Sequence, residues 1–409
     1  MAITIQQQPQ AYMPGYNNQW FTAVSNQIAQ PNFKYTVIVT DLISGDTATF
    51  QLPPRPDTLC VFDAGAAFAE NQIRTKNYIP INTYGWQVAT GVRKIRVNIG
   101  ETYGSTPTYY AGSNIDYIIW NGYVDWESFP DYDKDDYVYT TSPVNRKWFY
   151  GISNDLTFTD RSNYLYALTS QAGDLYQLQI RTYNSAGALL GTSYIDNPFQ
   201  ATTNYINKYI CIDVGHKGLT NIPSGQVTGT YPIITSSVAY YEIYDNPDPL
   251  VPAPVFIKRI DILCEPKYEV LTVHYLAKNG AFLSLNFNKV WNSDTDKNVK
   301  TFTQNTQDIN PATGDYGYNA YDSPVKALSI VTQTRLKLRT NFVTDEQVTQ
   351  YRECFDSPIC YLDRGSSRTY LAIRPVTGSY KNLPRYANRL TTIEMDFEFS
   401  HQNARQRAW

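Results

Sequence analysis

The stretch FKYTVIVTDLISGDTATF, residues 33–50, shows in simple form the pattern that recurs along this 409-residue chain. Every second position of its first half carries a bulky apolar side chain, at Phe33, Tyr35, Val37 and Val39. This period of two is typical of a strand with one face buried and the other in water. Ser44-Gly45-Asp46 supplies a turn before apolar residues return at Ala48 and Phe50. The stretch therefore predicts a β-hairpin.

The same alternation predicts strands through the rest of the chain. The clearest candidates are residues 95–99, 115–120, 164–168, 176–180, 209–214, 238–244, 257–263, 270–276 and 392–400. Turns are predicted at Asn184–Gly187 and at Asn279-Gly280. Four prolines from Pro247 to Pro254 exclude a central strand or helix, so we predict a domain boundary there. The sequence thus predicts a mainly β fold of two or three β-sandwich-type domains in tandem, with limits at 1–143, 144–254 and 255–409.

One short helix is predicted near residues 345–356, in the C-terminal domain. Thr344 is placed to cap its first turn, and Gln347, three residues later, is placed to bond back to the cap. Apolar side chains then follow at spacings of three and four, at Val348, Tyr351 and Phe355. This spacing gives the helix one apolar face.

Composition narrows the classes of function. Aromatic residues make up 14% of the chain, with 35 Tyr, and charged residues make up 17%, against about 25% in a typical soluble protein. The formal charge is −3, so the concentrated Lys and Arg of a nucleic-acid binder are missing and no such partner is expected. No run approaches the roughly 18 apolar residues of a membrane-spanning helix, and no export signal is visible. We expect a protein made in a cytoplasm, with a polar surface that carries few charges.

Side chains suited to catalysis or metal binding are few and scattered. The common motifs for nucleophilic, zinc and phosphate chemistry are missing from the sequence. We place His216 in a polar loop, His274 in a strand and His401 in the tail, each apart from paired ligands. The cysteines are predicted to be reduced and buried: Cys60, Cys211, Cys264, Cys354 and Cys360. We predict no enzyme activity, no cofactor and no metal site.

Two acidic runs invite comparison with a calcium loop. In the first, Asp131, Asp133 and Asp135 alternate, but the sixth position is not Gly and the twelfth is not Glu. The second run, at residues 294–305, fails at the same two places. A solvated turn is the favoured interpretation of each run, and a bound cation at the first stays open.

A dense aromatic segment is the candidate interaction site. It comprises Trp120, Tyr123, Trp126, Phe129 and Tyr132, interleaved with acidic residues. Tyr and Trp are enriched at interfaces because each joins apolar area to a hydrogen-bonding group, so a subunit contact or a core position is favoured. Stacking on sugar rings, with the acids binding hydroxyls, is the alternative. The candidate interface is completed by a C-terminal arm that would order on a neighbour, with Arg405, Arg407 and Trp409.

Residues 255–409 carry a recognisable arrangement of motifs. In order, these are Ile260–Cys264, Tyr268, Val273–Phe282 with its Asn-Gly turn, Phe287, Leu338–Thr344, the helix with Tyr351, Ser357-Pro358, Tyr361-Leu362 and Pro375–Thr377. The arrangement resembles the tail hub and distal tail proteins of phages that infect Bacteroides and its relatives, including the crAss-like phages.

The resemblance implies a virion component that is assembled in the host cytoplasm. It implies a mainly β protein that forms a ring at the end of a tail, joins the tail tube to fibres and other appendages, and binds copies of itself and other tail proteins. No catalytic residue is implied. We therefore expect a structural tail hub or ring protein. The alternative is a glycan-binding or glycan-cleaving adsorption protein that uses the aromatic strip from Trp120 to Tyr132.

Overall fold

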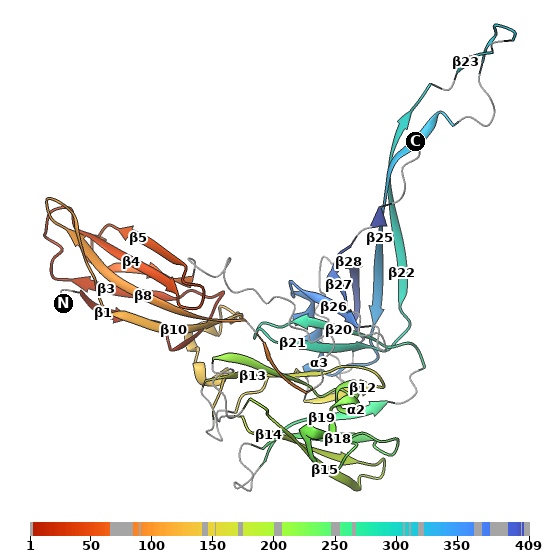
Figure 1. Cartoon of the computed structure of the whole chain (residues 1–409), viewed down its shortest axis with the longest axis horizontal. Helices are drawn as coiled ribbons and strands as arrows, with labels where there is room; N and C mark the ends of the chain where they lie inside the picture. Colours follow the sequence, from red (N-terminus) through yellow and green to blue (C-terminus); the bar gives the residue numbers. More distant parts are fainter. Residues whose placement is uncertain are drawn as a thin grey trace. The chain divides into compact units, whose positions relative to one another are not determined.

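The computed structural model describes residues 3–65, 85–89, 91–140, 146–151, 153–170, 175–199, 207–246, 254–263, 267–305, 307–310, 312–317, 323–363, 370–376, 392–401 and 403–404. Strands dominate these residues, which confirms the predicted mainly β fold (Figure 1). The chain forms two compact units. Unit 1 comprises residues 1–265 and 275–284, and unit 2 comprises residues 266–274 and 285–409.

Unit 1 begins with two sheets that share one core and that we call the first sandwich. The strand orders are β1-β3-β6 and β2-β10-β8-β4-β5, with β9 paired to β8. The strands are β1 (Ile3–Gln7), β2 (Tyr12–Pro14), β3 (Trp20–Ser25), β4 (Lys34–Asp41), β5 (Thr47–Leu52), β6 (Cys60–Asp63), β8 (Val92–Tyr103), β9 (Thr108–Tyr110) and β10 (Asn114–Trp120). Both sheets contribute to one hydrophobic cluster, which includes Phe21, Val37 and Ile95. The hairpin predicted at residues 33–50 is confirmed as the antiparallel pair β4 and β5.

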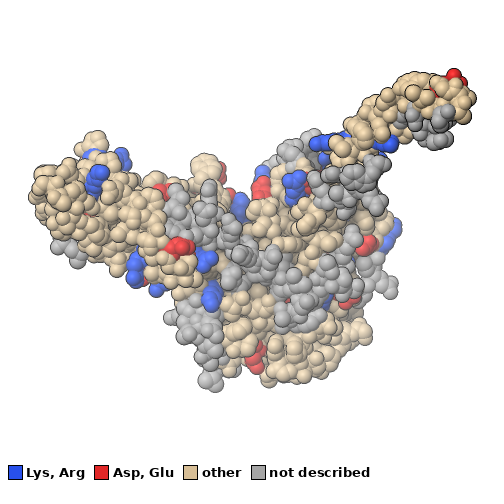
Figure 2. Space-filling view, turned by 45° about the horizontal axis from the view of Figure 1, so that its top comes forward, with Lys and Arg blue, Asp and Glu red and all other residues tan. Residues whose placement is uncertain are grey.

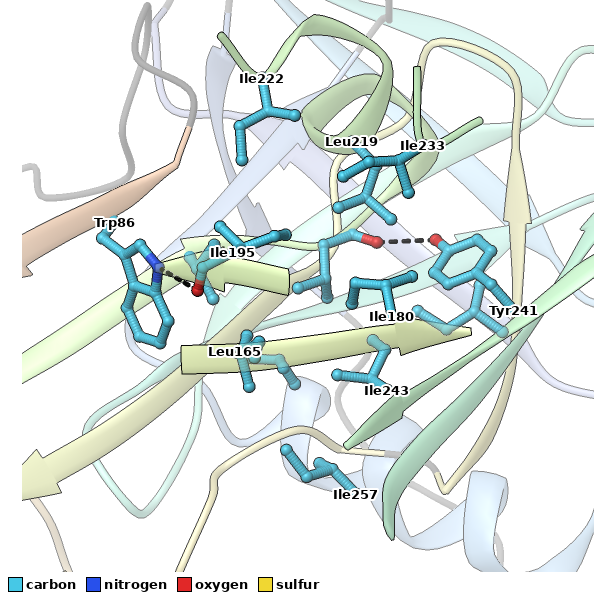
Figure 3. Packing of buried hydrophobic residues seen from close by; sticks show 14 of the residues in the cluster. Trp86, Leu165, Ile180, Ile195, Leu219, Ile222, Ile233, Tyr241, Ile243 and Ile257 are labelled. Atoms are coloured by element: carbon cyan, nitrogen blue, oxygen red, sulfur yellow. Dashed lines mark hydrogen bonds between the residues drawn. The ribbon is translucent and has the colours of Figure 1, made fainter. Parts of the chain in front are cut away.

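A second sandwich follows in unit 1, with strand orders β11-β13-β16-β7 and β12-β19-β18-β14-β15-β17. Its elements are β7 (Trp86–Ala89), β11 (Val138–Tyr139), β12 (Asn154–Phe158), β13 (Tyr164–Thr169), β14 (Gln177–Tyr183), β15 (Leu189–Asp196), β16 (Lys208–Asp213), α2 (His216–Asn221), β17 (Val227–Gly229), β18 (Tyr240–Asn246) and β19 (Val255–Leu263). Apolar side chains of both sheets and Leu219 of α2 form its core (Figure 3). Two polar groups within this core are satisfied by hydrogen bonds. The Trp86 indole donates to the Ile195 carbonyl at 3.3 Å, and the Tyr241 hydroxyl donates to the Val214 carbonyl at 2.7 Å.

The limits of the three predicted domains stay a prediction, to which the strand pairing adds two facts. Strand β7 lies in the predicted first domain by sequence, yet it pairs with β16 of the second sandwich. Strands β18 and β19 flank the proline-rich segment and pair antiparallel with each other. Proline prevents a strand from running through that segment. It does not prevent the strands on its two sides from joining one sheet.

Unit 2 is built on a sheet with the order β21-β20-β26-β27-β28-β25-β22, to which β29 adds by pairing with β25. Its elements are β22 (Asn292–Thr303), β23 (Asp308–Ile309), β24 (Tyr316–Gly317), β25 (Val325–Arg339), α3 (Asp345–Phe355), β26 (Cys360–Asp363), β27 (Tyr370–Pro375), β28 (Glu394–Phe399) and β29 (Asn403–Ala404). Strands β20 (Leu271–Leu276) and β21 (Phe282–Phe287) are each divided between the two units, because residues 275–284 belong to unit 1. The predicted helix is confirmed as α3, and Thr344 and Gln347 form the expected capping box. Tyr351 fixes α3 because its hydroxyl donates to the Asn286 carbonyl at 2.6 Å and its ring contacts Phe287.

Two local predictions are wrong. His216 does not lie in a loop but begins helix α2. Residues 294–298 do not form a turn but belong to β22, which pairs with β25 from Asn292 to Thr303. Cross-strand contacts explain the second difference, because Asp296 forms an ion pair with Arg335 at 3.2 Å and a long ladder outweighs a local turn preference.

Four cysteines are buried and free, as predicted: Cys60, Cys211, Cys354 and Cys360. Cys264 lies outside the described residues. Within the same described part, no helix has the length and apolar character needed to cross a bilayer.

Candidate interaction surface

The residues of the predicted aromatic strip occupy different environments. Trp120 is fully buried and stacks on Tyr137 at 5.2 Å between ring centroids. Tyr132 is half-buried and its hydroxyl donates to the Tyr12 carbonyl at 2.8 Å. Phe129 is half-buried, Tyr123 is exposed and Trp126 is 75% exposed. The strip is therefore divided, and its first ring cannot stack on a sugar or on a partner. Arg405, Arg407 and Trp409 lie outside the described residues.

The chain after Trp120 binds the turn of the β20–β21 hairpin, a contact inside unit 1. The Tyr123 amide donates to the Lys278 carbonyl at 2.7 Å, and the Lys278 ammonium binds the Asp125 carboxylate at 2.7 Å. The Tyr209 hydroxyl donates to the Asn279 carbonyl at 2.9 Å. This part of the predicted interface therefore serves an intramolecular contact.

The acidic run nearby is a capped turn. The Asp133 carboxylate accepts from the Asp135 amide at 3.0 Å and caps the short 3-10 helix η2 (Lys134–Asp136), which follows η1 (Phe129–Asp131). Lys134 pairs with Asp135, and Lys147 pairs with Asp136 at 3.1 Å. Among the residues that the structure describes, no group of three or more His, Cys, Asp or Glu is placed to hold a metal ion.

The predicted histidines lie apart from one another. The Nδ1 atom of His216 accepts from the Asp160 amide at 3.4 Å, and burial lowers the pKa of its ring. His274 is buried in β20, where its Nε2 atom lies 3.5 Å from Asp363 Oδ2. His401 is exposed. These positions do not form a shared site.

A different surface gathers tyrosine and arginine side chains. It lies on the outer side of β14, β18 and β19, because the alternate residues of these strands, such as Ile180 and Ile243, point into the core of the second sandwich. We call it the Tyr–Arg face and define it by Arg181, Tyr183, Tyr240, Glu242, Tyr244 and Arg259.

Stacking fixes the rings and guanidinium groups of the Tyr–Arg face. The rings of Tyr183 and Tyr240 are 4.8 Å apart and nearly parallel, at 9°. The Arg259 guanidinium lies 3.8 Å from the centroid of the Tyr240 ring, and the Arg181 guanidinium lies 4.3 Å from that of Tyr244. Cation–π contacts of this kind are favourable and directional. The side chains are therefore held in place by contacts within the chain itself.

Hydrogen bonds to acidic side chains balance the charge of this face. The Glu242 carboxylate accepts from the Tyr183 hydroxyl at 3.0 Å and from the Tyr244 hydroxyl at 2.7 Å. The Arg259 guanidinium donates to Asp261 at 2.8 Å. Burial raises the pKa of the Tyr244 phenol to about 12, and the bond to Glu242 adds to the rise. The phenol stays uncharged at neutral pH, so two cations face two carboxylates.

Exposed apolar side chains continue the same sheet beyond the Tyr–Arg face. On the side of that face they are Leu189 on β15, which pairs with Tyr183, Phe256 on β19, which pairs with Tyr244, and Leu263, which follows Arg259 and Asp261 at alternate positions. The Phe256 ring meets the Tyr244 ring edge-on at 5.6 Å. On the side of the molecule that Figure 2 shows, where these strands are not labelled, Lys, Arg, Asp and Glu form small groups among uncharged residues. Neutral, aromatic and apolar area in one sheet is typical of a protein interface.

Sequence reasoning identified these strands but missed the surface. The signal is the outer register of each strand: Arg181-x-Tyr183, Tyr240-x-Glu242-x-Tyr244 and Arg259-x-Asp261. Aromatic residues at these positions were interpreted only as part of the strand pattern. Tyr, Arg and acidic residues at alternate positions on three neighbouring strands indicate one continuous outer face.

Comparison with known proteins adds no family: no protein-family model matches the chain, and no curated protein is similar to it.

Proposed function

We propose that the chain is a structural component of a phage tail, a tail hub or ring protein that oligomerises and links the tail tube to fibres and other appendages. It would act by assembly and not by turnover of a substrate. The observation that carries this proposal is the Tyr–Arg face, and the resemblance of residues 255–409 supplies the tail as the setting.

The energetics of the Tyr–Arg face favour permanent contact. Tyr and Arg are the residues that most often dominate the energy of an interface. Stacked side chains such as Tyr240 and Arg259 have already lost rotamer freedom, so a partner that covers them loses little further entropy. Glu242 accepts from two phenol hydroxyls and Asp261 accepts two hydrogen bonds from Arg259, so burial leaves fewer polar groups unpaired.

The hairpin of β22 and β25 offers a second element for assembly. Every residue of β22 is exposed, and β22 ends the strand order of its sheet among the described residues. An edge strand presents unpaired amides and carbonyls, which a strand of another chain can bind. Ring formation would cover such an edge.

Sedimentation velocity and negative-stain microscopy test the assembly. The full chain is expected to form closed rings, and the double variant Tyr240→Ala/Arg259→Ala is expected to weaken self-association about a hundredfold or more, since two such residues commonly cost over 1 kcal/mol each. The matched control is Arg96→Ala, which removes an arginine paired with Asp116 at 2.7 Å on the first sandwich. If the double variant still forms rings with unchanged self-association, the Tyr–Arg face is not the assembly interface.

Immunogold microscopy tests the location. The test uses particles of the phage that encodes the chain, purified from infected cells. An antibody against the chain is expected to label one end of their tails. Label on the capsid alone, or unlabelled particles beside abundant free protein, contradicts the tail role.

A further inference from the structure

The first sandwich contains a pocket of 440 Å³ that the proposed function does not use. It is lined by Ile3, Glu101, Tyr103, Tyr109, Tyr110, Ala111 and Gly112. The volume is within the range of about 300–1,000 Å³ common for small-molecule sites. Glu101 pairs with Tyr110 across β8 and β9, so the wall brings one carboxylate to the same side of the sheet as the stacked rings of Tyr103 and Tyr110.

Glu101 is the unusual residue of this pocket. It is only 4% exposed. The Ser25 hydroxyl donates to its Oε2 atom at 2.5 Å, and the Gln27 amide donates in turn to the Ser25 hydroxyl at 2.9 Å. Within the described part of the chain, no Lys or Arg forms an ion pair with Glu101. A glutamate buried to this degree normally has a cationic partner, and no described residue supplies a positive charge to Glu101.

Two stacked rings lie beside Glu101 in this wall. The Tyr103 and Tyr110 rings stack at 4.6 Å, and Tyr110 remains 45% exposed. Tyr109 pairs with Thr102 and its ring lies on the other side of the sheet, where its hydroxyl donates to Asn98 Oδ1 at 2.7 Å. Its ring lies against the backbone of Gly100, where a Cβ atom would come within 2.5 Å of the ring. Because Gly100 of β8 has no side chain, the Tyr109 ring can lie directly against the backbone there.

We propose that this pocket binds an organic ammonium group. Phenol faces attract cations through the ring quadrupole, and the Glu101 carboxylate compensates the charge. Hard metal ions prefer six or more oxygen ligands, which one carboxylate does not provide. The ammonium group can come from a free methylated amine or from the lysine side chain of a partner, and the two sources share this chemistry.

Ligand-observed NMR with the full chain tests the proposal. Choline represents the methylated ammonium, n-butylammonium represents a lysine side chain, and 3,3-dimethylbutan-1-ol is the neutral isostere of choline. At least one cation is expected to bind with a dissociation constant of about 1 mM or lower, and the neutral isostere about tenfold more weakly or worse. Tighter binding of choline identifies a free small molecule, and tighter binding of n-butylammonium identifies a lysine.

Three variants connect the binding to the pocket. Glu101→Gln keeps an oxygen for the Ser25 hydroxyl but removes the charge, and it is expected to weaken cation binding about tenfold or more. Tyr110→Leu removes an exposed ring, is expected to lower the affinity too, and remains informative if Glu101→Gln does not fold. Glu127→Gln, at an exposed carboxylate outside the pocket, is the matched control and is expected to bind normally. Equal binding of the isostere, unchanged affinity in both pocket variants, or no binding of either cation at about 10 mM overturns the proposal.

Discussion

Replacing Lys258 by Met is expected to destabilise the second sandwich by about 4 kcal/mol. The Lys258 side chain is 1% exposed, and its ammonium lies 2.9 Å from Asp155 Oδ2 and 2.8 Å from the Tyr150 carbonyl. Methionine keeps the length of the apolar stem but removes the charge. The substitution therefore leaves the buried Asp155 carboxylate without its cation.

The magnitude follows from the contacts that are lost and those that stay. Removing one partner of a buried ion pair costs about 3–5 kcal/mol. The bond to the Tyr150 carbonyl adds about 1 kcal/mol. Two donors still reach Asp155, from the Asn163 side chain at 2.7 Å and from the Leu156 amide at 2.8 Å, and they limit the loss. These contributions place the expected cost in the middle of the range.

Hydrogen exchange followed by mass spectrometry provides the assay. Amides of β12 and β19, which carry Asp155 and Lys258 and pair with each other, are expected to lose about a thousandfold in protection. Lys147→Met is the matched control, because Lys147 pairs with Asp136 in a solvent-exposed position and its loss is expected to leave exchange unchanged. If the two variants lose protection equally, or if Lys258→Met loses less than about tenfold, the reasoning about the buried pair is refuted.

Three further predictions concern local stability. Thr344→Ala removes the capping box of α3 and is expected to cost about 1 kcal/mol, measured as faster amide exchange in the first turn of that helix. Asp245→Asn is expected to stabilise unit 1 at pH 7 but not at pH 4. Burial raises the pKa of the Asp245 carboxyl from 3.8 to about 6, so stability is lost as the pH rises through this window; thermal unfolding at both pH values checks it. Gly280→Ala is expected to destabilise more than Gly314→Ala. Both residues have φ near +75°, but a Cβ at Gly280 would meet the Asn121 carbonyl oxygen at 2.1 Å whereas Gly314 has open space, and the two melting temperatures compare them.

The sequence predicted the features that depend on neighbours in the chain. The alternation at residues 33–50 became β4 and β5, and the capping box of Thr344 and Gln347 is present in α3. Each of these depends on residues a few positions apart, whose geometry is set by a single element. Local pattern is sufficient for such features because the competing conformations are few.

Contacts between residues far apart in the chain could not be predicted from the sequence pattern. The burial of Trp120 and the contacts of the chain that follows it involve Tyr137 and the hairpin turn at Lys278, the latter more than 150 residues away. The pairing of β7 with β16 joins Val88 to Ile210. An aromatic residue in a strand looks the same in sequence whether it faces the core, another segment or solvent. Only the fold decides between these environments.

The high number of tyrosines therefore does not by itself indicate an interface. Several tyrosines are fully buried in unit 1: Tyr35, Tyr139, Tyr164, Tyr166, Tyr209, Tyr241 and Tyr275. Their rings fill cores and bond inward, as the Tyr241 hydroxyl does to the Val214 carbonyl, so they contribute nothing to adhesion. The case for assembly depends on the smaller set whose rings lie on the outer side of β14 and β18, Tyr183, Tyr240 and Tyr244. Each of these rings contacts another ring or a guanidinium and is still accessible, and the Tyr183 and Tyr244 hydroxyls bond to Glu242, so a partner can bury them at low cost.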